Sequence, residues 1–421
     1  MKTKEQIQHW IKTKNETKAR HENMDCKVFE LKIDYDKLSK EKLNHLNKMF
    51  TEAKWQYNYM LSQEDIFKYD YKVKQVKIKN KDGNFEDRII DVLGSQMKQG
   101  LFQRMKQNII NLSKSKKKGN DIGMLKFKSR IDSIPLNQYG ITYKFNDNKR
   151  YIKIQGLNKW IRVFGFKQIP EDAEFANAVL LRKPSGYYVK ITCFLPKKER
   201  VMTNKSVGID FGIKNSLTLS NGEKIDIKFR TSSKIKKEHR KLSRKKKGGR
   251  NFYKQKRQLE LAYEKQNNSK KDLQNKIVSD LVKRFDVIAM QDENIKAWQG
   301  GWFGKQIQES ALGGIMSDLK RKSHTLKVVP KFLPTTKGCY VCGEINKENR
   351  LEDRIFICDH CGFTEDRDIH SAKMIEKIGV GMERTELKPV ETSSSTSEGM
   401  QMHLPMQDLS MNQETSAFRQ R

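Results

Sequence analysis

The sequence predicts an α+β chain with several domains, and three observations lead to this class. The chain has 421 residues, which suits two or three domains. Hydrophobic residues make up 36% of it, enough for one moderate core and smaller ones. Blocks with the two-residue alternation of strands are followed by blocks with the three- and four-residue spacing of helices, so both kinds of element are expected in separate regions.

The first half of the chain predicts a small β-domain with helices inserted into it. Residues 1–25 are polar and basic and form an extension. Residues 26–33, CKVFELKI, alternate like a strand, whereas residues 35–62 and 90–112 have helical spacing and are followed by a basic loop, SKSKKKGND. Residues 136–200 contain β-forming runs separated by turn signals. We therefore expect an antiparallel barrel or sandwich, which the strand at 26–33 joins.

The second half of the chain shows the element order of an RNase H-like core. In this order we predict three strands in 206–230, a charged helical stretch in 232–284, a strand at 287–291, a helix at 304–323, a strand at 326–329 and a last helix from residue 369. A cysteine-rich region precedes that helix. The tail after residue 382 is rich in Ser, Thr, Met and Gln and is predicted to be disordered.

The net charge of +34, from 85 Lys and Arg against 51 Asp and Glu, points to a polyanion partner such as nucleic acid. Codon usage in an A/T-rich genome, which favours Lys, is an alternative source of part of this charge. The run at 234–257 is local, however, with 13 Lys and Arg in 24 residues. We predict RNA or DNA contacts for eleven of them: Lys236, Lys237, Arg240, Arg244, Lys245, Lys246, Lys247, Arg250, Lys254, Lys256 and Arg257.

The sequence favours a cytoplasmic location without membrane insertion. No stretch approaches the roughly 18 apolar residues of a membrane span. The N-terminus, MKTKEQIQHWIKTKNE, lacks the apolar region of a secretory signal. Six Cys in a long, Lys-rich chain also fit a reducing compartment with a metal site better than a disulfide scaffold.

Four of the cysteines form two CxxC pairs, each followed by a Gly that permits a tight turn. Four thiolates in two such pairs suit a tetrahedral structural zinc site. Such a site is closed to water, so it should stabilise a small ribbon and not catalyse a reaction. Unliganded or redox-active cysteines are the alternative. The predicted zinc ligands are Cys339, Cys342, Cys358 and Cys361.

Carboxylates lie where the RNase H-like core would hold metal ions. Asp210 ends the first core strand, Asp368 precedes the last helix, and QDEN (291–294) follows the fourth strand. Two Mg²⁺ ions about 4 Å apart need several carboxylates and can activate water against a phosphodiester. Taken singly, Asp210 could instead form an Asx-turn and Asp368 a helix N-cap.

These features together resemble the TnpB family, the transposon-encoded RNA-guided nucleases related to compact type V CRISPR effectors. The resemblance rests on four motifs: VGIDFGIKN, RKLSRKKKGGRNFYKQKRQLE, CYVCG…CDHCG and DRDIHSAKMI. It covers the chain from about residue 24 to about residue 391. The family motif has Asn where His370 stands, which is a departure from the pattern.

The resemblance implies a helical lobe inserted in an oligonucleotide-binding barrel, called the wedge, and a zinc ribbon inserted in a RuvC-type nuclease core. In chain order the expected parts are a basic extension (1–25), the wedge barrel (26–34 and 136–200), the helical recognition lobe (35–135), the RuvC core (201–336 and 362–382), the zinc ribbon (337–361) and a disordered tail (383–421).

The function that the resemblance implies is RNA-guided cleavage of DNA. A guide RNA and a target DNA would be the partners, with Mg²⁺ or Mn²⁺ in the RuvC site beside the structural zinc. Such a protein is prokaryotic and nucleoid-associated, and acts as a monomer or a homodimer. Aromatic residues near basic ones, such as Tyr57, stack on bases or pack in the core.

Two further functions remain as alternatives. One is a nuclease-dead, RNA-guided repressor of transcription from the same family, which binds DNA without cutting it. The other is a DNA strand-transfer transposase, which also uses an acidic RNase H-like core. The zinc ribbon and the LSRKKKG stretch argue against the second of these.

The choice between cleavage and binding depends on the segment after the fourth strand. Aligned on Asn294, the usual Glu position of the family is occupied by Gln291, which carries no charge. Residues 291 and 293 point to the same face of an extended strand, about 6.6 Å apart, whereas Asp292 points to the other face. We therefore predict an active nuclease that uses Asp210, Glu293 and Asp368.

Overall fold

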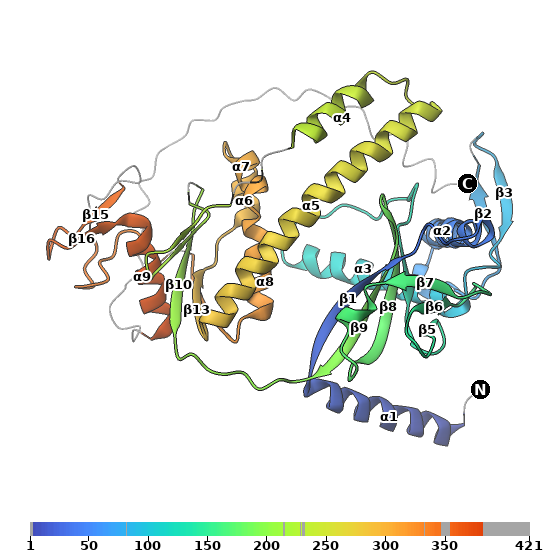
Figure 1. Cartoon of the computed structure of the whole chain (residues 1–421), viewed down its shortest axis with the longest axis horizontal. Coiled ribbons are helices and arrows are strands. Elements are labelled where there is room, and N and C mark those ends of the chain that lie inside the picture. Colours follow the sequence, from blue (N-terminus) through green and yellow to red (C-terminus); the bar gives the residue numbers. More distant parts are fainter. Residues whose placement is uncertain are drawn as a thin grey trace. The chain divides into compact units, whose positions relative to one another are not determined.

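The computed structural model describes residues 3–80, 82–213, 215–227, 229, 232–331, 333–346 and 354–381 (Figure 1). They form two compact units, one within residues 1–202 and 230–273 and the other within residues 203–229 and 274–421. Helices and strands are both abundant, which confirms the predicted α+β class. Within the described ranges, no helix is long and apolar enough to cross a membrane. The predicted disordered tail lies outside the described residues.

The first unit contains a seven-stranded antiparallel sheet, which confirms the predicted β-domain and its first strand. The strand order across the sheet is β4-β8-β9-β1-β7-β6-β5. β1 (Met24–Ile33) pairs along its length with β9 (Gly186–Pro196). The other strands are β4 (Ser133–Leu136), β5 (Tyr143–Phe145), β6 (Tyr151–Ile154), β7 (Ile161–Phe164) and β8 (Glu174–Lys183), with a short helix η2 (Phe166–Gln168) after β7.

Two helices and a hairpin are inserted between β1 and β4 and share one hydrophobic core with the sheet. They are α2 (Lys40–Leu61), η1 (Ile66–Lys68), the hairpin of β2 (Gln75–Lys79) and β3 (Phe85–Ile89), and α3 (Ser95–Lys117). The buried carboxylate of Glu52 on α2 accepts the backbone N–H groups of Asp91, Val92 and Leu93, at 3.3, 3.0 and 2.7 Å. These bonds fix the chain just before α3, so the two helices have a defined spacing.

The second inserted helix lies later in the chain than the sequence predicts. Residues 85–89 pair in the hairpin, so α3 begins at Ser95 and not at residue 90. Its last turn contains Lys114, Lys116 and Lys117, which were predicted to belong to a basic loop. Cations near a helix C-terminus interact favourably with the helix dipole, and this explains why the Lys run extends the helix.

The basic N-terminal extension forms a helix, α1 (Lys4–Glu22). Thr3 and Gln6 form a reciprocal capping box at its start. At its end the ring of His21 stacks on Phe194 with 3.6 Å between ring centroids, and Glu174 accepts hydrogen bonds from Arg20 and contacts His21. The helix is therefore attached to the sheet at its C-terminal end.

The charged stretch after the third core strand forms two helices, not one. α4 (Ser233–Ser243) and α5 (Arg250–Arg284) are separated by a turn in which Gly248 has a φ of 83°. Ile235 of α4 packs against Leu259 and Ala262 of α5. Residues 230–273 are grouped with the first compact unit, and the boundaries of the nuclease core remain a prediction.

The second unit contains a five-stranded sheet in the order β12-β11-β10-β13-β14. β10 (Ser206–Phe211) is antiparallel to β11 (Leu217–Leu219) and parallel to β13 (Val287–Gln291), which in turn is parallel to β14 (Thr325–Val329). The edge strand β12 (Lys224–Ile225) pairs with β11. Three antiparallel strands followed by two parallel ones, joined by helices, confirm the predicted RNase H-like core.

Helices cover both faces of this sheet. On one face lies α9 (Arg367–Val380), whose backbone approaches β10 so closely that a Cβ on Gly208 would be 2.0 Å from the Ala372 carbonyl oxygen. On the other face the end of α5 packs with α8 (Leu312–Lys322) in one core. The predicted helix at 304–323 is broken into α7 (Gly304–Ser310) and α8 because Ala311 has a φ of 62°.

A short helix and a small ribbon complete the second unit. α6 (Ile295–Gln299) follows β13. β15 (Ile355–Ile357) and β16 (Thr364–Asp366) pair with each other immediately before α9. Part of the predicted zinc ribbon, residues 347–353, lies outside the described residues, but its four cysteines are described.

Candidate functional site

The three predicted carboxylates come together at one edge of the core sheet. Asp210 lies near the C-terminal end of β10, Glu293 follows β13, and Asp368 is in the first turn of α9. Burial and then the negative charges of Asp368 and Glu293 raise the pKa of Asp210 to about 7, whereas Arg367 opposes the rise. The negative charges of Asp368 and Glu293 therefore act on Asp210.

The sequence left open an Asx-turn role for Asp210 and an N-cap role for Asp368, and neither residue has that role. Asp210 is paired with Thr218 in the β10–β11 ladder, so it is not a turn residue. The N-cap of α9 is Asp366, whose Oδ1 accepts the N–H groups of Asp368 and Ile369 at 3.1 and 3.2 Å. The Asp368 carboxylate instead accepts from Nδ2 of Asn215 at 3.3 Å.

Gln291 has the strand position next to Asp210, but its side chain is bonded to a loop. The parallel register pairs Gly208 with Ala289 and Ile209 with Met290, so Asp210 and Gln291 come next. The Gln291 amide Nε2 donates to the carbonyls of Pro330, Lys331 and Leu333, at 3.4, 2.9 and 3.4 Å.

The remaining polar atom of the Gln291 side chain is bonded as well. The hydroxyl of Thr335 donates to Oε1 at 3.3 Å, and the Gln291 residue is 8% exposed. The amide therefore acts as a buried link between the end of β13 and the loop at 330–335. A carboxylate at this position could not donate to the three carbonyls.

Glu293 approaches the site because the chain bends after the strand. The N–H of Glu293 donates to the Gln291 carbonyl at 2.9 Å, which is a three-residue turn and shortens the extended spacing of the two residues. Glu293 is half-buried, and burial raises its pKa while nearby Lys331 lowers it. Asp292 points elsewhere: its Oδ1 accepts from Lys320 at 3.0 Å.

The four cysteines form a cluster whose geometry suits a single tetrahedral metal ion. Their Sγ atoms all lie within 4.8 Å of one another, with 3.8 Å from Cys339 to Cys361 and 3.6 Å from Cys342 to Cys358. A tetrahedron with Zn–S bonds of about 2.3 Å has S–S edges of about 3.8 Å. Gly343 and Gly362, with φ of 83° and 68°, form the turn after each pair.

The cysteine ribbon packs on α9 through His370, which the sequence analysis did not identify as important. The imidazole is fully buried and stacks on Phe356 of β15 at 3.5 Å with 10° between the ring planes. Its Nε2 accepts the backbone N–H of Tyr340, between the first two cysteines, at 3.3 Å. Burial, with a smaller effect of Lys373, lowers the pKa of His370 to about 4, so the ring is neutral and can accept this bond.

The eleven predicted nucleic-acid-binding residues lie on α4, on the start of α5 and in the turn between them. All eleven are exposed. The buried side of α4 is provided by Ile235 and Glu238 instead. Exposed cations of this kind are accessible to a phosphate backbone.

Two family models match the chain. The first, OrfB_IS605, described as "Probable transposase", matches residues 188–298, and the second, described as "Cas12f1-like, TNB domain", matches residues 316–375. The first model spans β10, the basic helices and the segment with Gln291 and Glu293. The second model spans β14, both cysteine pairs and Asp368.

Curated relatives share about half of the chain. A protein of Streptomyces pristinaespiralis named "Putative RNA-guided DNA endonuclease" is 28% identical over 51% of this chain and 55% of its own length. The similarly named InsQ of Escherichia coli K12 is 28% identical over 52% and 60%. "TnpB-like protein L79" of Acanthamoeba polyphaga mimivirus is 31% identical over 27% and 23%. The matches thus span little more than half of the first two relatives.

Two solved structures are similar at low sequence identity. A Cas12f1–sgRNA–target DNA complex has a TM-score of 0.49 and 13% identity, covering 84% of this chain and 99% of that one. CasPhi-2 (Cas12j) bound to crRNA has a TM-score of 0.34 and 11% identity, covering 55% and 61%.

The RNase H-like sheet, the acidic edge and the cysteine ribbon before the last helix lie within the regions that the two family models match. The chain is thus similar to proteins of the TnpB family over residues 188–298 and 316–375, and to curated RNA-guided DNA endonucleases over about half of its length.

Proposed function

We propose that the protein is an RNA-guided DNA endonuclease that hydrolyses phosphodiesters at the edge defined by Asp210, Glu293 and Asp368. The observation that carries this proposal is the contrast between Glu293 and Gln291. Glu293 is close enough to contribute to the raised pKa of Asp210, whereas the Gln291 amide is bonded to the loop at 330–335. The missing acid at residue 291 is therefore replaced by Glu293 in this proposal.

The three carboxylates fit a site for divalent cations. Oxygen ligands are those that Mg²⁺ and Mn²⁺ prefer, and cations would offset the repulsion that adds to the effect of burial on the pKa of Asp210. Two bound ions would supply Lewis-acid stabilisation of the attacking and leaving oxygens. Among the described residues, only the four cysteines form a group of three or more potential ligands spaced closely enough to hold a metal ion.

The chain's own residues have separate tasks in this proposal. Asp210, Glu293 and Asp368 hold negative charge at fixed positions on β10, after β13 and on α9. Asn215 donates to Asp368 and fixes its orientation. Gln291 acts as a positioning residue, because it ties the end of β13 to the loop at 330–335.

The partners proposed for this activity are a guide RNA and a target DNA. The eleven exposed cations on α4, α5 and their turn support this proposal, as does the net charge of +34. The curated relatives are named as RNA-guided DNA endonucleases, which also favours it. The same fold without cleavage, a guided DNA-binding repressor, is the second candidate.

Zinc is the metal proposed for the four cysteines. The ribbon core contains little apolar surface, mainly Phe356 with partly buried Phe363 beside the cysteines, so metal binding would contribute to its folding. Elemental analysis should find one zinc per chain, and Cys342→Ser with Cys361→Ser should remove it and lower the melting temperature. A zinc-free wild-type protein of unchanged stability would contradict this assignment.

Cleavage of a guided target is the test of the main proposal. The protein is purified with RNA transcribed from the DNA flanking its gene and given plasmids that carry the guide-matched sequence, with Mg²⁺ or Mn²⁺. Asp210→Ala, Glu293→Ala and Asp368→Ala should each reduce cleavage by about a hundredfold or more, because several kcal/mol of transition-state stabilisation are lost. Guided binding should be retained, and Asp292→Ala is the matched control. Wild-type binding without any cleavage would favour the repressor.

A further inference from the structure

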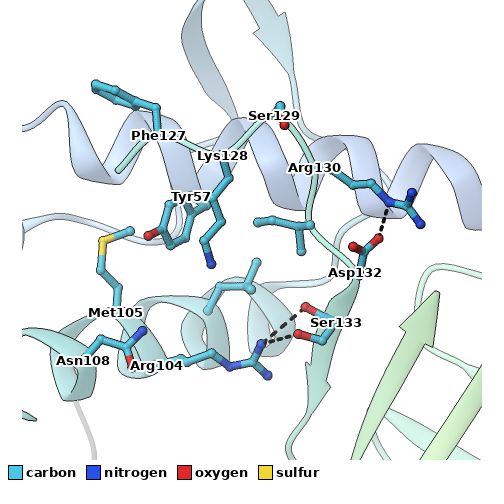
Figure 2. A pocket seen from close by; sticks show the side chains of 12 residues that line it. Tyr57, Arg104, Met105, Asn108, Phe127, Lys128, Ser129, Arg130, Asp132 and Ser133 are labelled. Carbon is cyan, nitrogen blue, oxygen red and sulfur yellow. Dashed lines mark hydrogen bonds and ion pairs between the residues drawn. The ribbon is translucent and has the colours of Figure 1, made fainter. Parts of the chain in front are cut away.

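A cavity of about 460 Å³ lies in the first unit, between α2, α3 and the segment that leads to β4 (Figure 2). Volumes of this order are typical of small-ligand sites. None of the predicted metal ligands or of the eleven basic residues on α4 and α5 lines it, although Tyr57, one of the aromatic residues that could stack on bases, does. Its position and chemistry therefore need an explanation of their own.

The walls of the cavity are fixed by side-chain to backbone bonds. Asn58 of α2 donates to the Lys128 carbonyl at 2.9 Å and accepts the Lys128 N–H at 2.8 Å, so it pairs with this residue as a strand would. At the other end of the segment, Arg104 of α3 donates to the Ser133 hydroxyl at 2.9 Å and to its carbonyl at 3.3 Å. The segment is thus attached to α2 at Lys128 and to α3 at Ser133.

One wall of the cavity is apolar and another is polar. Leu101, Met105 and Ile131 line its apolar part and are at most 6% exposed, so only a small part of each side chain faces the cavity. Asn108 stands one helical turn from Met105 on the same helix, so its amide adds a donor and an acceptor beside that surface. An apolar wall next to an amide matches a nucleobase, which has flat faces and a hydrogen-bonding edge.

Positive charge surrounds the same cavity. The Lys128 ammonium lies 4.4 Å from the centre of the Tyr57 ring, and Figure 2 shows its side chain passing beside that ring. Arg104 and Arg130 are the other cations, against a single acidic residue, Asp132, which Arg130 contacts. Phe127, 55% exposed, stands at the rim. Cations and an aromatic ring at the mouth suit the phosphates and the neighbouring base of a single strand.

We propose that this cavity binds one unstacked nucleotide of a single-stranded nucleic acid, with the base against Leu101 and Met105, its edge on Asn108 and its phosphate near Lys128. The inference rests on the proposed function, since it takes nucleic acid as the partner. It deepens that function by assigning a base-binding site outside the basic helices. The strand is a guide RNA or a DNA strand separated from its complement, and these two sources share the chemistry.

The experiment uses the full-length protein and 20-nucleotide single strands of defined composition, both RNA and DNA. Affinity is measured by fluorescence anisotropy for Asn108→Ala and Lys128→Ala. Each has a matched control of the same chemical change nearby, Asn111→Ala on the same helix and Lys126→Ala on the same segment. Photo-crosslinking with 4-thiouridine in U20 and 4-thiothymidine in dT20, followed by peptide mapping, locates the contacted residues directly.

We expect Asn108→Ala and Lys128→Ala to weaken single-strand binding by about tenfold, the size of one lost base contact. The controls should change it less than twofold, and cross-links should fall within residues 101–133. A stronger effect with U20 identifies RNA as the source, and one with dT20 identifies DNA.

Two results would overturn the inference. Variants that match their controls, with cross-links only elsewhere, would reject the cavity while leaving the proposed function intact. A wild-type protein that binds no nucleic acid would reject both. Melting curves of all four variants show whether each is folded, and the cross-link map of the wild type decides the question if one is not.

Discussion

At the scale of single residues, Gln291 illustrates how a substitution at an expected ligand position can be structural. Its amide nitrogen donates to three loop carbonyls and its oxygen accepts from Thr335. Glutamate has the same shape but cannot donate when ionised, so it would place an anion against three carbonyl oxygens. The sequence leaves open why Gln stands at residue 291. The hydrogen bonds favour the explanation that its amide links β13 to the loop at 330–335.

The corresponding prediction concerns Gln291→Glu. We expect a loss of about 1–3 kcal/mol in the free energy of unfolding, because buried acceptors lose their donor, and no gain in guided cleavage. Thermal melting and the plasmid assay measure the two effects, with Asp292→Asn, an exposed neighbour, as the control. A wild type that never cuts and a Gln291→Glu variant that does would instead show that the site had lost its acid.

Asp210 gives a prediction about pH. Its pKa is raised to about 7 in the folded protein, against about 4 in an unfolded chain. Between these values the folded state binds more protons than the unfolded state, so stability falls as pH rises from about 4 to about 7. Asp210→Asn removes the charge and should therefore stabilise the magnesium-free protein above pH 7, with little effect near pH 4.5.

The measurement is the melting temperature of both proteins across this range in magnesium-free buffer. Asp172→Asn, at an exposed turn, is the control for a general loss of negative charge. Adding Mg²⁺ should reverse the order at high pH, since the ion stabilises the wild type and not the variant. A gain from Asp210→Asn that does not depend on pH would show that Asp210 is not under this electrostatic strain.

At the scale of elements, the last helix connects the cysteine ribbon with the acidic edge. α9 carries Asp368 in its first turn. Two residues later, the ring of His370 on the same helix stacks on Phe356 of the ribbon. Lys377 also donates to the Tyr340 carbonyl, and Lys373 binds Glu365. The ribbon therefore holds α9, whose first turn carries the Asp368 carboxylate, against displacement.

We predict that His370→Ala weakens cleavage through the position of Asp368. The stacked ring and the Tyr340 bond are lost, at a cost of about 2 kcal/mol or more in stability. Guided cleavage should fall mainly in kcat, while guided binding and zinc content stay within twofold. His370→Asn, the residue usual in the family, keeps an acceptor and should restore part of the rate. His324→Ala, an exposed histidine, is the control, and equal losses in KM and kcat for His370→Ala would contradict a positioning role.

Elements with a clear pattern were predictable from the sequence. The strand at 287–291 has the predicted bounds, and β1, β14 and α2 are close to theirs. Breaks inside helical patterns were missed, because the turn at 244–249 and the left-handed Ala311 lie in sequence that is otherwise helical. The length of α3 was missed because a Lys run resembles a loop when the helix dipole is not considered.

The candidate site was predictable only where chain order determines it. Asp210 and Asp368 follow from the order of strands and helices. The bonding of Gln291 depends on carbonyls about 40 residues later in the chain, and the role of His370 depends on the placement of the ribbon. Contacts between distant segments carry no local signal, so single-sequence reasoning left Gln291 and Glu293 as alternatives and did not identify His370.

At the scale of the whole molecule, the excess of 34 positive charges would affect every step in which the proposed nucleic-acid partners bind. Such a charge attracts any polyanion, so affinity alone does not locate the binding surface. The eleven exposed residues on α4, α5 and their turn are the proposed surface, whereas other exposed lysines are spread over the rest of the chain. Salt dependence separates specific phosphate contacts from this general attraction.

The last prediction compares two variants of equal net charge. One replaces Lys245, Lys246, Lys247 and Arg250 with Gln, and the other replaces Lys27, Lys77, Lys144 and Lys167, which are exposed on three strands and the short helix η2 of the first unit. Each phosphate contact contributes about 0.7–0.9 to the slope of log affinity against log salt. The first variant should therefore bind RNA transcribed from the flanking DNA with a slope lower by about 3, and the second should keep nearly the wild-type slope. Equal changes in both variants would mean that the chain binds RNA through its overall charge and not through the basic helices.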